Sequence, residues 1–248
     1  MTIRILLSAF LLFLPSLIIL AADIEVSGNC KLRNAIVAAN KDKAVKGCKA
    51  GSGADTIRLT SDITLTAELP KIKSHITIEG GNFTLDGGNR FRLIYVGGGT
   101  AVINNLKLQH GFNADRGGAV YIPNGSLTIN NSVIVNNRTN GKGGAMRIKN
   151  GSVTINDSNI SGNEARLNGG AISSRGPKLT INNSVIMGNR AHKLGGGIHV
   201  WGDSSKLVLN NSQIAFNLAG KSGGISAKKA PKPVLNNSSV HNNMPTDF

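Results

Sequence analysis

Apolar residues recur along this chain with one long, fixed period. Aligned on its Asn-rich segments from Thr100 onward, the chain has one apolar column at Ile103, Ile129, Ile155, Ile181, Leu209 and Leu235, whose successive steps are 26, 26, 26, 28 and 26. A second column gives the same steps and contains Leu108, Ile134, Ile160, Ile186, Ile214 and Val240. Because both columns share one irregularity, the period is a structural repeat, and its extra length falls in the loop 201–205.

Within each repeat, apolar and polar residues alternate over short stretches that Asn and Gly residues bound. Leu127 and Ile129 share one face, for example, whereas Thr128 points the other way. This pattern is typical of strands and turns and not of helices. A repeat of this length cannot bury its apolar face alone, so each repeat is expected to form one coil of a parallel β-solenoid and to stack on its neighbours.

Two columns of Asn residues follow the same register. One contains Asn104, Asn130, Asn156, Asn182, Asn210 and Asn236; the other contains Asn137, Asn163, Asn189, Asn217 and Asn243. Stacked amides can hydrogen-bond to one another along the axis, so we interpret both columns as structural ladders in preference to binding sites. The ladders also create Asn-x-Ser matches as a by-product, which are therefore weak indicators of glycosylation.

The first part of the chain predicts export. Residues 1–22 combine a basic start at Arg4, an apolar stretch and a small-residue end at Ala21 and Ala22, the order of a cleaved signal peptide. Pro15 interrupts the apolar run, which disfavours a membrane anchor. We therefore divide the chain into a signal peptide at 1–22, a cap with the first strands at 23–75, and solenoid coils at 76–248, and expect a secreted or surface-exposed protein.

The start of the mature chain is expected to close the solenoid. The spacing of Leu32, Ala35, Ile36 and Ala39 predicts a short helix with one apolar face, which would cover the open core of the first coil. Cys30 and Cys48 are the two cysteines of the chain, and in an exported protein they most simply form a disulfide. They provide too few ligands for a metal site, and no cofactor is expected.

The other end shows no equivalent cap in the sequence. Two readings remain open: Pro245 and Phe248 help to close the last coil, or the sequence is a truncated piece of a longer chain.

Charge points to an anionic partner. The chain has 28 Lys and Arg against 13 Asp and Glu, a formal net charge of +15. The loop before each glycine pair carries basic residues that would form a basic stripe if the coils stack: Arg116, Arg138, Lys142, Arg166, Arg190, Lys193 and Lys221. A solvated face is the alternative. Export favours an acidic polysaccharide or cell-envelope surface over nucleic acid, and adhesion to such polymers is the predicted role.

Two family resemblances agree with this architecture. Gly117-Gly118-Ala119-Val120, Gly143-Gly144-Ala145-Met146 and Gly169-Gly170-Ala171-Ile172 are similar to the GGA[ILV] element of chlamydial polymorphic outer-membrane protein repeats. Cys30-Lys31-Leu32-Arg33-Asn34-Ala35 resembles the CSLREA segment of exported bacterial β-helix proteins, with Lys31 and Asn34 departing from it. The resemblance implies a single-stranded right-handed parallel β-helix of the pectate-lyase-like kind, displayed at a cell surface and often adhesive.

Parallel β-helices also carry polysaccharide-cleaving enzymes, so a catalytic site has to be sought among the residues. Hydrolysis needs a close carboxylate pair, and Asp157 and Glu164 fall on different sides of one coil. Arg147 and Lys149 lie two apart, hence on one strand face, and could serve a lyase acting on uronate-containing glycans, which is the alternative function. Ice binding through Thr128, Thr154 and Thr180 is the least favoured reading.

Overall fold

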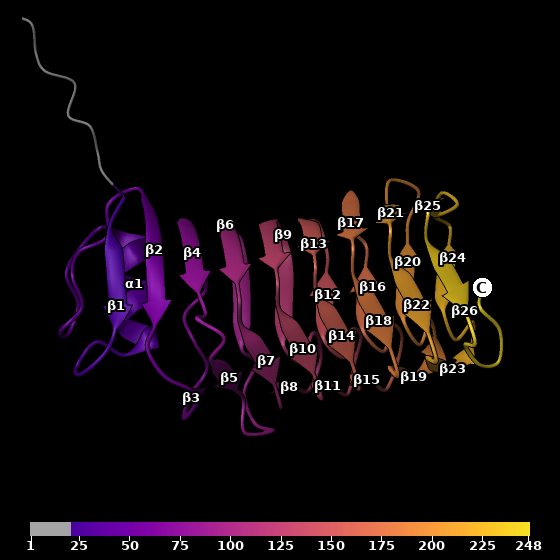
Figure 1. The fold of residues 1–248 in the computed structure, drawn as a ribbon, viewed down its shortest axis with the longest axis horizontal. Coiled ribbons are helices and arrows are strands. Elements are labelled where there is room, and N and C mark those ends of the chain that lie inside the picture. Colours follow the sequence, from indigo (N-terminus) through magenta and orange to yellow (C-terminus); the bar gives the residue numbers. More distant parts are fainter. Residues whose placement is uncertain (1–20) are drawn as a thin grey trace, which may run out of the picture.

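The computed structural model describes residues 21–248 and has the form of a straight rod of stacked coils (Figure 1). The predicted signal peptide, residues 1–22, lies outside the described residues except for Ala21 and Ala22. The coils contribute strands to three sheets, the third of which begins only at residue 112, and every pairing between named strands joins one coil to the next in parallel.

Within residues 21–248, the first sheet has 13 strands: β1 (Asp23–Val26), β2 (Ala54–Leu59), β4 (His75–Glu79), β6 (Ile94–Asn104), β9 (Val120–Asn130), β12 (Met146–Ile148), β13 (Ser152–Asn156), β16 (Ile172–Ser174), β17 (Lys178–Asn182), β20 (Ile198–Trp201), β21 (Lys206–Asn210), β24 (Ile225–Lys228) and β25 (Val234–Asn236). β6 and β9 run unbroken, whereas in later coils the same path is divided into two strands by a bend. The ladder already begins at β1, so the region 23–75 shares a sheet with the later coils.

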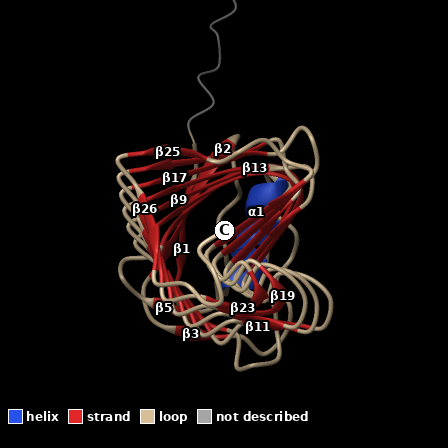
Figure 2. Cartoon of the chain, turned by 90° about the vertical axis from the view of Figure 1, so that its right-hand side faces the viewer, coloured by secondary structure: helices blue, strands red, loops and turns tan. Residues whose placement is uncertain are grey.

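Two further sheets complete each coil in this part of the chain. The second contains β3 (Ile63–Thr64), β5 (Thr84–Asp86), β7 (Lys107–Gln109), β10 (Val133–Val135), β14 (Asn159–Ser161), β18 (Val185–Met187), β22 (Gln213–Ala215) and β26 (Ser239–His241). The third contains β8 (Phe112–Asn113), β11 (Arg138–Thr139), β15 (Glu164–Ala165), β19 (Arg190–Leu194) and β23 (Leu218–Lys221). Viewed along the rod, the three sheets enclose one interior (Figure 2).

The predicted register is confirmed. Ile103 pairs with Ile129, and Ile181 pairs with Leu209, as the first apolar column requires. Ser174 pairs with Val200 at the ordinary step of the repeat, but Lys178 pairs with Lys206, which lies two positions beyond that step. The extra length therefore lies between positions 200 and 206, where the sequence placed the insertion.

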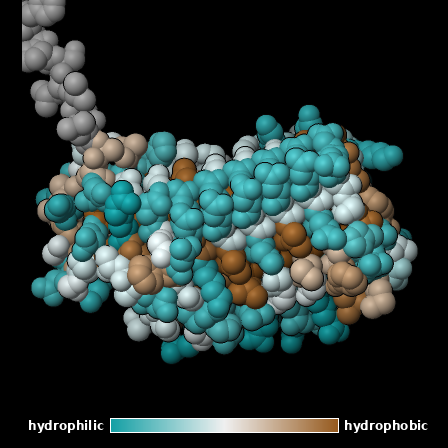
Figure 3. All heavy atoms as spheres, viewed as in Figure 1, coloured by the Kyte–Doolittle hydropathy of each residue, from teal (hydrophilic) through white to brown (hydrophobic). Residues whose placement is uncertain are grey.

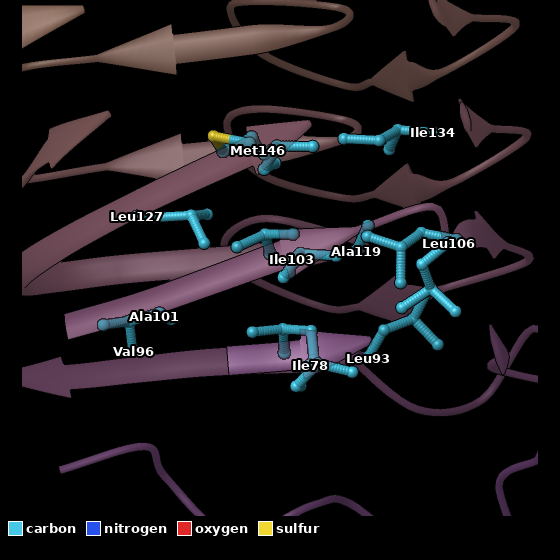
Figure 4. Close-up of a cluster of buried hydrophobic side chains, with 14 of the residues drawn as sticks. Ile78, Leu93, Val96, Ala101, Ile103, Leu106, Ala119, Leu127, Ile134 and Met146 are labelled. Atoms are coloured by element: carbon cyan, nitrogen blue, oxygen red, sulfur yellow. The ribbon is translucent and has the colours of Figure 1, made fainter. Parts of the chain in front are cut away.

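Apolar side chains from successive coils fill the interior. Figure 4 shows residues such as Ile78, Ile103 and Leu106 pointing into this shared core. Each of these three side chains is almost completely buried. Because the coils stack about 4.8 Å apart, one isoleucine in each coil contacts the same column in the next, so burial is cooperative along the rod.

The corner between the first and second sheets explains the Asn-Asn pairs. The first Asn of each pair joins the predicted ladder; the Asn130 amide, for example, donates to Asn104 Oδ1 at 2.8 Å, and Asn156 donates to Asn130 at 2.7 Å. The second residue, such as Asn131 with φ 46°, turns the chain in the left-handed region, which Asn tolerates better than most residues. Figure 3 shows a continuous hydrophilic row along the rod.

The glycine pairs are needed at the corner between the third and first sheets. Gly143 has φ 74°, in the region that favours glycine. A Cβ on Gly144 would overlap the carbonyl oxygen of Gly170 in the next coil. The coils can therefore approach one another here only because neither position carries a side chain.

The predicted N-terminal cap is confirmed. The helix α1 (Leu32–Lys41) lies at the far end of the view in Figure 2 and buries the apolar face predicted from Leu32, Ala35, Ile36 and Ala39. Cys30 and Cys48 form a disulfide. Within the described residues, no helix is long and apolar enough to cross a membrane.

The last residues return to the open end of the rod, where the C-terminus lies over the middle of the last coil (Figure 2). Ile225 N–H donates to the Asp247 carbonyl at 2.7 Å, and the Asp247 carboxylate accepts from the side chain of Asn243 at 2.9 Å. Pro245 and Phe248 stay exposed. Asp247 therefore makes the closing contacts that one of the two readings of the sequence assigned to Pro245 and Phe248.

Candidate functional site

The outer face of the first sheet carries a column of polar and aromatic side chains. The register pairs Tyr95 with Tyr121, Tyr121 with Arg147, Arg147 with Ser173, Ser173 with His199 and His199 with Ser226. Neighbours on these strands, such as Ile122 and Ile148, point into the core. The column therefore faces outward, and its five steps of about 4.8 Å span roughly 24 Å along the rod.

Two further columns flank this outward-facing column, which forms a floor between them. On one side, where the strands end at a bend, Trp201 pairs with Lys228, and Arg175 N–H donates to the Ile148 carbonyl of the preceding coil at 2.9 Å. On the other side, the turn before the glycine pair stacks Arg116 on Lys142 and Asn168 on Leu194. The floor and its two borders are thus built from equivalent positions of successive coils.

Two clefts lie between these columns. One, of about 330 Å³, is lined by Lys142, Arg147, Asn168, Ser173, Arg175, Leu194, His199, Trp201 and Lys228. The other, of about 290 Å³, is lined by Asp115, Arg116, Tyr121, Lys142, Arg147, Lys149, Leu167 and Arg175. Because both are lined by Lys142, Arg147 and Arg175, we treat them as one feature and call it the cationic groove.

Positive charge dominates the cationic groove. Asp115 is the one carboxylate among its lining residues, and it pairs with Arg116 at 2.7 Å. None of the ion pairs in residues 21–248 includes Lys142, Arg147 or Arg175. Arg147 is half-buried and donates to the hydroxyl of Ser173 at 2.9 Å, which fixes the guanidinium without neutralising it. An anionic ligand would supply the missing charge.

Burial and repulsion by neighbouring cations lower the pKa of two side chains in the cationic groove, Lys142 and His199. Burial lowers the pKa of Lys142, and the nearby guanidinium of Arg147 lowers it further. His199 is only 4% exposed. Burial, followed by the positive charges of Lys142 and Arg147, lowers the pKa of His199 to about 4, so its imidazole is neutral at pH 7.

Two polar atoms in the groove have no partner. His199 Nδ1 and Asn168 Oδ1 are both buried and make no hydrogen bond. Both residues line the larger cleft. Unsatisfied buried polar atoms are uncommon in native proteins and are a recognised feature of functional sites.

Aromatic side chains lie at both ends of the groove. The Arg175 guanidinium stacks over the Trp201 ring at 4.4 Å from its centroid. At the other end, Tyr95 and Tyr121 pack edge to face at 5.2 Å, and Arg92 lies over both rings. Such rings offer flat apolar faces next to polar tips.

The structure separates the residues predicted as a basic stripe. Arg116 and Lys142 line the cationic groove, and Lys221 continues their column past Leu194. Arg138 and Arg190 lie in the third sheet on either side of Glu164, in one column. Arg166 and Lys193 follow this sheet position in their coils, and both are exposed. The seven residues therefore occupy neighbouring columns and do not form a single line.

Arg147 and Lys149, considered in the sequence as a lyase pair, both line the groove. Sequence reasoning missed Arg175, His199, Trp201 and Lys228. The repeat contained a signal for them, because Arg175 and Trp201 follow Lys149 one and two repeats later at the same coil position. Their shared column has no common residue type, however, so it is visible only once the register is known.

Comparison with known proteins gives one positive result. A family model described as a right handed beta helix region matches residues 92–246, which include every residue of both clefts. No curated protein and no solved structure matches the chain.

Proposed function

The chain belongs to the right-handed β-helix family, and on this scaffold we propose that it binds an anionic polysaccharide along the cationic groove. The observation that carries the proposal is the set of unpaired cations in the groove: Lys142, Arg147 and Arg175 have no carboxylate partner in residues 21–248. Lys142 and Arg147 are half-buried. Cations in that position are costly unless a ligand satisfies them.

The shape of the groove favours a linear polymer over a compact ligand. Cations occur in three successive coils, at Arg116, at Lys142 and Arg147, and at Arg175, and Lys228 follows two coils later, so a chain lying along the rod meets several positive charges spaced by multiples of about 4.8 Å. Carboxylates accept paired hydrogen bonds from guanidinium groups. Trp201 is half-buried and adds a flat face on which a sugar ring can rest, and the side chain of Asn168 lines the same cleft. A uronate-containing glycan offers all of these groups.

The proposed location is outside the cell or on its surface. The signal-peptide pattern of residues 1–22 supports export. The Cys30–Cys48 disulfide supports an oxidising compartment. The resemblances to the CSLREA segment and to the polymorphic outer-membrane protein repeats support display and adhesion. The outlying stripe residues, Arg138, Arg166, Arg190, Lys193 and Lys221, would extend the basic surface beside the groove.

The test is retention of the purified protein on immobilised polyuronate over a range of salt concentrations. The double variant Lys142→Gln/Lys228→Gln removes two charges from the groove, and Lys178→Gln/Lys206→Gln removes two from another part of the first sheet, where the two lysines stack on each other. The groove variant should elute at clearly lower salt, because each charge-assisted contact contributes about 1.5–3 kcal/mol. Equal elution of the two variants would refute the groove as the binding surface.

A uronate lyase is the second candidate, favoured by the position of neutral His199 in the same cleft as Arg147, with Ser173 between them. In such a reaction a base removes the proton next to the carboxylate, and the bond to the leaving sugar oxygen breaks to give a double bond. The low pKa of His199, about 4, makes it a weak base for this step, so binding ranks first. Ultraviolet absorbance of the same samples tests it: unsaturated product that grows with time and is lost in His199→Gln would establish a lyase.

A further inference from the structure

A second unsatisfied group lies at the opposite end of the rod, in the first coil. Asp55, in β2, is only 1% exposed. Its Oδ1 accepts a hydrogen bond from Ser52 N–H at 2.6 Å and a longer one from Ala22 N–H at 3.3 Å. Its Oδ2 is buried and has no hydrogen-bond partner among residues 21–248. None of the ion pairs in residues 21–248 includes Asp55.

A buried carboxylate without a cation is expensive, because burial removes the water that stabilises its charge. The space around it is also restricted. A Cβ on Gly51 would lie 2.5 Å from Oδ2, so the carboxylate rests directly against the backbone of that glycine. The nearest donor that could become a cation is the main-chain nitrogen of Ala22.

We infer that the leader is cleaved between Ala21 and Ala22, and that the freed α-ammonium group of Ala22 forms an ion pair with the buried Asp55 carboxylate. Cleavage is hydrolysis by a leader-removing peptidase: water adds across the peptide bond, the carboxylate stays on Ala21, and the amine of Ala22 takes a proton. The inference rests on the export proposed above and is independent of the groove.

The contacts of Ala22 favour this bond over its neighbours. The Ala22 carbonyl accepts Thr56 N–H at 2.8 Å, and the Ala22 side chain packs against the core, whereas Ala21 is exposed. Cleavage one residue later, at the 1–22 boundary, would remove both contacts and one donor of Asp55. Cleavage after Ala21 keeps them all and replaces one N–H donor by an ammonium with three, enough to reach Oδ2 as well.

The first measurement is the intact mass of the protein after the full 248-residue chain is expressed in an exporting bacterial host. The expected mass is that of residues 22–248. A product that begins at Asp23, or at any residue before Ala22, overturns the ion pair and leaves the proposed binding function standing. A chain that is retained with its leader overturns both the ion pair and the proposed export.

The second measurement tests the pairing itself with Asp55→Asn in the exported protein. Asp62→Asn is the matched control, since Asp62 also accepts a backbone N–H, that of Thr84, but is exposed. Asp55→Asn should lower the melting temperature by roughly 5–10 °C, because it leaves a partly buried ammonium without its counter-ion. It should also make the α-amine react roughly tenfold faster with an acylating reagent, the change that loss of about 1.4 kcal/mol of protection gives.

The labelling rate separates an ion pair from a purely structural turn. If Asp55 only caps the backbone of Ser52, the variant will melt earlier but its α-amine will be labelled as fast as in the unmodified protein. That result overturns the inference. The mass measurement needs no variant, so the inference stays testable even if Asp55→Asn does not fold.

Discussion

The buried Asn ladder makes a quantitative prediction about stability. Asn163 is 1% exposed, and its amide nitrogen donates to the Ile134 carbonyl at 2.9 Å, to the Ser161 carbonyl at 3.0 Å and to Asn189 Oδ1 at 2.9 Å. Its oxygen accepts from the backbone N–H of Asn137 at 2.9 Å and from the Asn137 amide at 3.0 Å. The two amide hydrogens are shared among three acceptors, so one side chain ties three coils together through five donor–acceptor contacts.

The cost of Asn163→Ala follows from what these groups lose. Several of them keep other partners: the Asn137 amide still donates to two carbonyls, and the Ser161 carbonyl still accepts Asn136 N–H. The backbone N–H of Asn137 loses its acceptor inside the protein. An orphaned buried donor costs about 1–3 kcal/mol and each lost bond about 1 kcal/mol, so we expect a total of roughly 3–5 kcal/mol.

Asn156→Ala is the matched control. Asn156 belongs to the outer ladder, is half-buried, and makes two side-chain bonds within its ladder, at 2.7 and 2.6 Å. Water can replace these bonds, so its substitution should cost about 1 kcal/mol. Urea unfolding followed by circular dichroism gives both free energies, and hydrogen exchange of the Asn137 amide gives the local effect. Equal losses for the two variants would refute the reasoning.

Three further predictions follow from the structure. Cys48→Ala should lower the free energy of unfolding by about 3 kcal/mol in the chain-entropy model, measured in urea without reductant, because it opens a loop with a sequence separation of 18. Gly188→Ala, with open space at its Cβ but a left-handed backbone, should lower the free energy of unfolding by the strain of one such residue, about 1–2 kcal/mol. Gly144→Ala should lower it by more, because its Cβ would overlap the Gly170 carbonyl oxygen. Similar melting temperatures for the two variants would contradict this. His199 has its pKa lowered to about 4 from 6.5, so the folded state resists the proton that the unfolded state binds. The contribution of neutral His199 to the free energy of unfolding is complete above about pH 6.5 and falls by roughly 3 kcal/mol as the pH approaches 4. The unmodified protein should therefore lose stability relative to His199→Gln on acidification. A stability difference independent of pH would contradict the buried neutral state.

Much of the fold could be predicted from the sequence because the solenoid is built from local repeats. The apolar columns at Ile103 and Leu108 define which residues face the core, because a shift of one residue in the strand register would turn the apolar face to solvent. The Asn columns are equally visible, since an amide ladder needs the same residue at the same position in every coil. The cap was predictable from the helical spacing of Leu32, Ala35 and Ile36.

The site was less accessible to sequence reasoning. The sequence analysis identified four groove residues in two separate features. Arg116 and Lys142 belonged to the basic stripe, and Arg147 and Lys149 to the alternative of a lyase. The structure joins them because the turn before the glycine pair stands beside the strand that follows it. Outward positions carry no repeated residue type, since core packing does not constrain them, so Arg175, His199 and Trp201 share coil positions with earlier groove residues but no residue type that would mark them as a site.

The sequence by itself determined the period, the strand register, the interior and the polar ladders, because each depends on one residue type recurring at one coil position. The tertiary structure alone decided which outward side chains meet, how deeply His199 is buried among cations, and that Asp55 faces the nitrogen of Ala22. These depend on distances between different columns and on the loss of water around each group, which the order of residues along the chain does not contain.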